Sequence, residues 1–108
     1  MKKLDLNKCP LTAALKVIGG KWKPLIILSL RKSPKRFGQL DYLIPQVSRK
    51  VLASHLAEMV EDQLLIRQSY AETPPRVEYS LTDKARELVP IFQAMRDWGE
   101  YLVESEEP

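Results

Sequence analysis

Residue types that can bind nucleic acid gather near the middle of this chain. Ser48, Arg49 and Lys50 stand together, and Ser54 follows Lys50 by about one helical turn. Arg and Lys donate hydrogen bonds to O6 and N7 of guanine and to phosphate, and a serine hydroxyl can reach either a base or a phosphate. An ordinary solvated helix start could carry the same residues, so the elements around this group decide between the two interpretations.

The pattern around this group predicts two consecutive helices. A short amphipathic segment from Phe37 to Ile44 ends at Pro45, which disfavours helical backbone in the residue before it. Ser48 is a good N-cap for a second helix that extends to about Gln63. Helical periodicity then separates an inward face from an outward one. The inward face holds Leu52, Leu56 and Met59, with Val60 at its edge, and the outward face holds Lys50, Ser54, Ala57 and Glu61.

Two alternating segments follow and predict a β-hairpin. They cover residues 65–70 and 77–81, and a Pro74-Pro75-Arg76 turn lies between them. Helix, turn, basic helix and basic-tipped hairpin, in this order, predict a winged helix-turn-helix: mainly α with a small β-hairpin, one helix in the DNA major groove and the hairpin against the neighbouring backbone. We then expect contacts to the DNA backbone, which position the protein on the duplex, from Lys35, Arg36 and Arg76. Ordinary polar loops would also account for these three residues.

The flanking helices are predicted to form a dimer interface. The first begins at Cys9-Pro10 and ends at Gly19-Gly20, and Pro24 is expected to open a buried second helix. The last helix is expected to begin after a Thr82 N-cap and to bend at Pro90. Its apolar stripe is too wide to be buried completely in one small core. The expected interface residues are Leu11 and Leu15 of the first helix and Leu88, Phe92, Met95, Trp98 and Leu102 of the last.

Cys9 is the single cysteine and a candidate redox sensor. At a helix N-terminus beside Lys8 its thiolate is favoured over the thiol, and the thiolate is the reactive form. An inert residue in a packed terminus is the competing interpretation. A lone cysteine excludes an internal disulfide, so oxidation would lead to an intersubunit disulfide, a mixed disulfide with a small thiol, or an S-adduct.

Composition bounds the remaining possibilities. The 108 residues suit one domain covering 1–108. Residues 1–50 hold 12 basic and 2 acidic side chains, a net +10, and residues 51–108 hold 5 and 12, a net −7. A basic half suits a phosphate backbone, and the acidic half is expected to face away. The start lacks a signal peptide and the longest apolar run, Leu25–Leu28, is too short for a membrane span, so a cytoplasmic protein is expected.

No catalytic pattern is recognisable in this sequence. It has no Gly-rich phosphate loop, no Gly-x-Ser-x-Gly elbow and no His pair, because His55 is the single histidine. An enzyme, a metal site and a cofactor are therefore not expected. The alternative to a DNA-binding regulator is a winged helix that serves as a protein–protein interaction module, with a partner bound to the acidic half and the last helix.

Five blocks of sequence resemble the HxlR-type transcriptional regulators, small winged-helix proteins of bacteria. The resemblance covers about Cys9 to Leu102, and it implies a homodimer held by the first and last helices that binds operator DNA. It also implies that some members sense oxidants or electrophiles through the cysteine before the proline. The matching blocks are Cys9-Pro10, residues 17–26 (VIGGKWKPLI), residues 34–37 (PKRF), residues 48–52 (SRKVL) and residues 74–82 (PPRVEYSLT).

Two positions depart from the pattern of that family. Gln63 stands where a Gly usually ends the recognition helix, and a left-handed cap there would cost Gln ~1 kcal/mol relative to Gly. Ala85 stands where the last helix usually begins with Gly, and Ala is the better helix former. Neither position touches the predicted DNA face. The expected partners are thus a near-palindromic DNA duplex and a second copy of the chain, with a small-molecule or oxidant effector left open.

Overall fold

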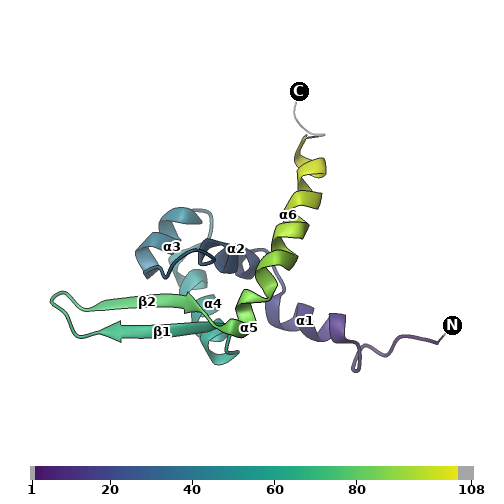
Figure 1. Ribbon diagram of the computed structural model, residues 1–108, viewed down its shortest axis with the longest axis horizontal. Coiled ribbons are helices and arrows are strands. Elements are labelled where there is room, and N and C mark those ends of the chain that lie inside the picture. The colour runs from purple at the N-terminus through teal and green to yellow at the C-terminus, as the bar shows by residue number, and fades with distance from the viewer. Residues whose placement is uncertain (1, 105–108) are drawn as a thin grey trace.

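The computed structural model describes residues 2–104, in which six helices and one β-hairpin form a winged helix-turn-helix. In Figure 1 the hairpin extends from one side of the helical body, α1 from the opposite side, and α6 rises out of the body between them. No helix in this part of the chain is long and apolar enough to cross a bilayer. The elements are α1 Pro10–Ile18, α2 Trp22–Ser29, α3 Phe37–Leu43, α4 Arg49–Glu61, β1 Leu65–Tyr70, β2 Arg76–Leu81, α5 Asp83–Arg86 and α6 Leu88–Glu104.

The core lies between α2, α3, α4, the base of the hairpin and the start of α6. Burial of α2 confirms the expectation that it is the central helix, and the buried face of α4 is the predicted one. Apolar area removed from water is the main stabilising term for such a small domain. The buried apolar residues are Ile26, Ile27, Leu30, Leu40, Ile44, Val47, Leu52, Leu56, Met59, Leu64, Leu65, Leu81, Ala85 and Phe92.

The turn between α1 and α2 depends on both glycines, each for a different reason. Gly20 has a φ of 92°, which glycine adopts without strain, whereas Gly19 is extended and so is not the left-handed cap. A Cβ at Gly19 would collide with the carbonyl oxygen of Leu15. Helix α2 begins at Trp22, two residues before the expected start at Pro24. The first turn of a helix has no intrahelical use for its N–H groups, so a proline there is tolerated.

Capping hydrogen bonds set the boundaries of α3 and α4. The backbone N–H of Arg36 donates to Oε1 of Gln39 at 2.8 Å before α3. Ser48 is the N-cap of α4, as predicted, and its Oγ accepts from the N–H of Val51 at 3.1 Å. After α4 the chain turns at Gln63, whose φ of 61° is the left-handed conformation for which the glycine usual in the resembling family would be suited.

The hairpin is joined to the helical body through a third, very short strand segment. Strands β1 and β2 pair antiparallel from Leu65 opposite Leu81 to Tyr70 opposite Arg76. Lys35, in a segment expected to be a plain loop, exchanges two backbone hydrogen bonds with Tyr79 at 2.8 and 3.0 Å. A one-residue bridge has no alternating pattern, so the sequence carries no signal for it. This bridge fixes the wing relative to the start of α3.

The C-terminal helix is interrupted instead of being one bent helix. Thr82 caps α5 as predicted, but α5 ends at Arg86 and α6 begins at Leu88. Pro90 has no N–H for the carbonyl of Arg86, and its ring crowds that carbonyl, so the break lies one turn before the proline. The predicted single domain extends over 1–108, of which Met1 and residues 105–108 lie outside the described residues.

Candidate nucleic-acid interface

The N-terminal end of α4 presents a basic, solvent-exposed surface. Ser48, Arg49, Lys50 and Ser54 are all exposed, and Lys50 and Ser54 belong to the outward face predicted for this helix. The positive end of the helix dipole lies at the same place and adds to the attraction for phosphate. Glu61, at the other end of this face, is also exposed. Docking onto DNA by the N-terminal end therefore avoids the acidic end of the helix.

Arg49 is held in place by two residues of α3. Its Nη1 lies 3.4 Å from Oδ2 of Asp41, and its guanidinium lies 5.2 Å from the centre of the Phe37 ring. The Arg49 side chain nevertheless remains 74% exposed. A guanidinium that is oriented before binding loses less conformational freedom when it meets a base or a phosphate. These contacts link the two helices of the helix-turn-helix unit at the proposed DNA face.

Lys35 and Arg36 lie beside this surface, just before α3. Arg36 is exposed, and no carboxylate lies within 4.0 Å of its side chain among residues 2–103. Lys35 is half-buried, and its Nζ donates to Oγ of Ser33 at 3.2 Å. Its backbone belongs to the bridge with Tyr79, so this lysine is fixed to the wing as well as to α3.

The wing is not the basic tip that the sequence predicted. Arg76 is the first residue of β2, and its guanidinium nitrogens lie 3.1 Å from Glu72 and 3.0 Å from Glu78. Its guanidinium also lies 4.0 Å from the centre of the Tyr70 ring. Two carboxylates thus offset one cation at the tip: Glu78 lies two residues further along β2, on the same face of the strand as Arg76, and Glu72 lies in the turn before it. Arg76 would have to exchange one of these contacts to bind phosphate.

One ion pair at the back of α4 was not foreseen from the sequence. Lys23, which follows Trp22 in α2, is almost fully buried, and its Nζ lies 2.8 Å from Oε2 of Glu58. The hydrogen bond and charge of Lys23 hold the pKa of Glu58 below its usual value. Nδ1 of His55 lies 3.7 Å from the same carboxylate. The only available signal was a lysine within an apolar helix, which alone does not identify the partner.

Cys9 is the N-cap of α1, as predicted, and is half-buried. Its side chain makes no capping hydrogen bond of ordinary geometry, but the nearby backbone N–H and then the hydroxyl of Thr12 lower the pKa of the Cys9 thiol, and partial burial opposes them. The thiol is therefore electrostatically prepared for deprotonation.

The predicted dimer residues divide into two groups. Leu11, Leu15, Met95, Trp98 and Leu102 are exposed on α1 and α6, and Leu88 is half-buried. Phe92 does not belong with them, because it is only 3% exposed and lies in the core of the single chain. The start of α6 packs on α2, so its inward positions serve the chain's own core and only the outward positions stay open. Tyr101 and Ile91 are also exposed on α6, although neither was among the predicted interface residues.

Comparisons with known proteins agree with this geometry. A model of the HxlR-like helix-turn-helix family matches residues 17–107. The chain is 40% identical to the HTH-type transcriptional regulator YdeP of Bacillus subtilis strain 168 over 96 residues, 89% of this chain and 75% of YdeP. It is also 40% identical to YkvN of the same organism over 106 residues, 98% of this chain and 87% of YkvN.

Solved structures of similar sequence share the fold. The redox regulator HypR in its oxidized form superposes with a TM-score of 0.82 at 39% identity, covering 86% of this chain and 96% of HypR. The reduced form of the transcriptional regulator YodB from B. subtilis gives a TM-score of 0.76 at 37% identity, covering 92% of this chain and 98% of YodB. The fold and the basic helix define a winged helix-turn-helix regulator. The chain belongs to the HxlR-like helix-turn-helix family and is a transcriptional regulator of this type.

Proposed function

We propose that this regulator binds duplex DNA with the N-terminal end of α4 in the major groove. The observation that carries the proposal is the exposed pair Arg49 and Lys50 at the dipole end of α4, capped by Ser48. Arg49, Lys50 and Ser54 would face base edges, and Lys35 and Arg36 would hold the phosphate backbone. Arg76 would add less than a free cation, because Glu72 and Glu78 already neutralise it.

The proposal includes a homodimer formed by α1 and α6. Exposed apolar side chains on both helices support it, since contiguous apolar surface of this kind is typical of interfaces. Figure 1 supports it too, because α6 extends out of the body and leaves most of its length without cover from its own chain. A two-fold dimer would offer two α4 helices to successive major grooves, roughly 34–36 Å apart, and would select a near-palindromic operator.

A redox response through Cys9 is the second part of the proposal. Similarity to the redox regulator HypR and the lowered pKa of the Cys9 thiol support it. Diamide would take two electrons and two protons from two thiols, either two Cys9 side chains of a dimer or Cys9 and a small thiol, and would leave one disulfide. Because Cys9 begins α1, such a bond would move a dimerisation helix and with it the spacing of the two α4 helices.

A gel shift on DNA from upstream of the protein's own gene tests both parts. The reduced protein should retard this DNA and not an unrelated duplex, and the affinity should fall steeply as salt is added. Diamide should change the retardation by the wild type and leave Cys9→Ser unaffected. A chain that acts only as a protein–protein module would retard neither DNA. Modification of Cys9 without any change in DNA affinity would eliminate the sensing part alone.

A further inference from the structure

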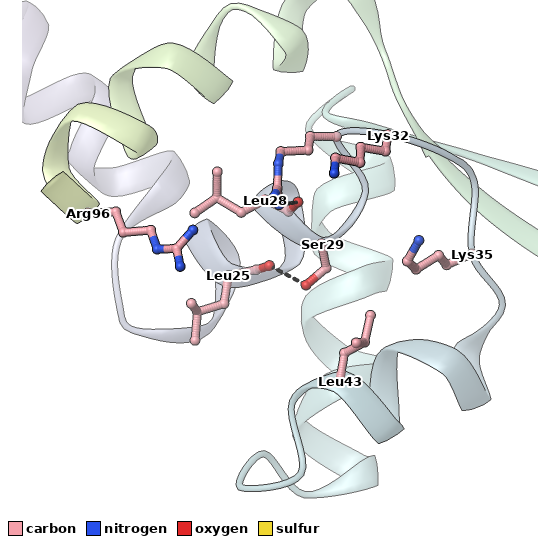
Figure 2. Close-up of a pocket in the computed structure, with 8 residues that line it drawn as sticks. Leu25, Leu28, Ser29, Lys32, Lys35, Leu43 and Arg96 are labelled. Carbon is pink, nitrogen blue, oxygen red and sulfur yellow. Dashed lines mark hydrogen bonds between the residues drawn. The ribbon is translucent and has the colours of Figure 1, made fainter.

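A cavity of about 510 Å³ lies between α2, α3 and α6, away from the apolar faces of α1 and α6 described above. Figure 2 shows its arrangement: Arg96 enters from α6, Leu43 points in from α3, and Leu25 and Leu28 lie on α2 between them. The Lys32 and Lys35 side chains lie on the side opposite Arg96. The lining residues are Leu25, Leu28, Ser29, Arg31, Lys32, Lys35, Leu43 and Arg96.

All the charged residues that line the cavity are cationic. Arg31, Lys32, Lys35 and Arg96 line it, and no Asp or Glu does. Among the side chains that the structure describes, no carboxylate lies within 4.0 Å of any of these four groups. Arg31 donates to the carbonyl oxygen of Leu28 at 2.7 Å, which is a neutral partner. Unpaired cations around one hollow produce a positive potential that attracts an anion.

The remaining walls are apolar, so a bare inorganic anion is not the ligand that fits this cavity best. Leu25 and Leu43 are exposed and Leu28 is half-buried, so they offer open apolar surface at the cavity. The Ser29 hydroxyl donates to the carbonyl of Leu25 at 2.7 Å and so has no hydrogen left to donate. A phosphate, whether free or in a DNA backbone, would leave the leucines uncovered. A ligand with both a charge and an apolar body would use both kinds of wall.

We propose that this cavity binds an amphipathic organic anion, a carboxylate carried on an aromatic ring system or a short hydrocarbon chain. Its carboxylate would accept hydrogen bonds from the cations on one side of the cavity, either Arg96 or Lys32 with Lys35, and its apolar body would lie on Leu25, Leu28 and Leu43. The volume falls within the range of ordinary small-molecule clefts, roughly 300–1,000 Å³. The cavity is then an effector site distinct from Cys9.

Its position couples the ligand to the DNA-binding elements. Arg96 belongs to α6, and Lys35 precedes α3 and is bridged to the wing through Tyr79. A ligand that spans the cavity between these two sides would fix α6 relative to α3 and the hairpin, and a ligand that prefers one such arrangement shifts the population toward it. This coupling rests on the proposed DNA-binding function, whereas binding of the anion does not.

NMR of the full chain without DNA tests the site directly. Titration with 2-naphthoate should shift the amide signals of Leu25, Leu28, Ser29 and Leu43. Binding of 2-naphthalenemethanol or inorganic phosphate should be at least roughly tenfold weaker, because the alcohol lacks the negative charge and phosphate lacks the apolar body. The double variant Lys32→Gln/Arg96→Gln should weaken 2-naphthoate by roughly tenfold or more. Arg86→Gln, an exposed arginine of α5 outside the cavity, is the matched control and should change nothing.

Several results would overturn the proposal. The cavity would be excluded as the binding site if 2-naphthoate shifted only signals from the apolar faces of α1 and α6. Equal binding of the alcohol and the carboxylate would show that the cationic side chains do not recognise the ligand. Loss of DNA affinity in Lys32→Gln/Arg96→Gln, with no binding of 2-naphthoate to the wild type, would assign the cations to the DNA backbone instead. If 2-naphthoate binds in the cavity but no DNA is retarded, the site stands and the proposed DNA-binding function fails.

Discussion

Lys23 of α2 and Glu58 of α4 form an ion pair of 2.8 Å between the central helix and the back of the basic helix. The Lys23 side chain is 10% exposed and the Glu58 side chain 52% exposed, so the cation is buried while its partner faces solvent. A buried ammonium without a partner is strongly unfavourable, whereas an apolar residue of similar volume in its place is often neutral. The pair therefore fixes the rotation of α4, and with it the direction of Arg49 and Lys50.

Removing the two partners should have opposite consequences for stability. Glu58→Gln leaves Lys23 buried beside a neutral amide and should lower the melting temperature by a few degrees, and Lys23→Met added to it should restore most of the loss. Because the pKa of Glu58 is lowered in the folded chain, its stabilising effect is fully present above the ordinary pKa of a glutamate and is lost as pH falls through the lowered value. Thermal melts at several pH values measure this, and a Glu58→Gln deficit that persisted unchanged into acid would contradict it.

Gln63 should be a position where glycine stabilises the fold. Its φ of 61° costs a residue with a Cβ about 1 kcal/mol relative to Gly, so Gln63→Gly should raise the melting temperature by roughly 4–8 °C. The hydrogen bond from Thr82 Oγ1 uses the backbone carbonyl of residue 63 and would persist. Gln93→Gly, inside α6, is the matched control and should be destabilising by about 1 kcal/mol. A lower melting temperature for Gln63→Gly would show that its side chain matters more than its backbone.

Thr12 should control the reactivity of Cys9. In Thr12→Val the backbone N–H remains and the hydroxyl is lost, so the pKa of the Cys9 thiol should rise part of the way toward that of an ordinary cysteine. The pH profile of the rate of alkylation by iodoacetamide should move to higher pH by the same amount. Thr73→Val, in the exposed wing, should leave the profile in place. An unchanged profile in Thr12→Val would show that the Thr12 hydroxyl does not lower the pKa of the Cys9 thiol.

Trp98 should be a major contributor to the proposed dimer. It is 67% exposed in the single chain, and buried tryptophans at interfaces typically contribute 2 kcal/mol or more. Trp98→Glu should therefore weaken self-association by roughly 30-fold or more, measured by sedimentation equilibrium. Tyr42→Glu changes a still more exposed aromatic residue on α3 and should not affect association. A wild type that sediments as a monomer at micromolar concentration would contradict the dimer itself.

The order of elements was predictable from the sequence because each depends on local chemistry. Ser48 caps α4 through its own hydroxyl, Pro45 follows α3 closely, and the alternation of residues 77–81 is visible in the chain. The inward face of α4 followed from helical periodicity alone, and Leu52, Leu56 and Met59 are buried as expected.

Features set by tertiary contacts were not predictable in this way. The sequence shows Arg76 as a basic residue in a turn, whereas in the structure it begins β2, where Glu78 shares its face of the strand and the register brings Tyr70 opposite it. Phe92 fits the apolar stripe of α6, but the packing of α6 on α2 decides which positions of the stripe enter the core. The partner of Lys23 lies 35 positions away in the chain, beyond the reach of any local pattern.

Fluorescence anisotropy of labelled DNA tests the central claim most directly. The reduced wild type should bind its upstream DNA more tightly than an unrelated duplex, with a logarithmic affinity that falls linearly with the logarithm of salt concentration. Arg49→Gln and Lys50→Gln should each reduce this preference by about 1–3 kcal/mol, while Arg86→Gln should not. If both variants keep the affinity and the preference of the wild type, the N-terminal end of α4 does not read DNA and the docking proposed for this regulator is wrong.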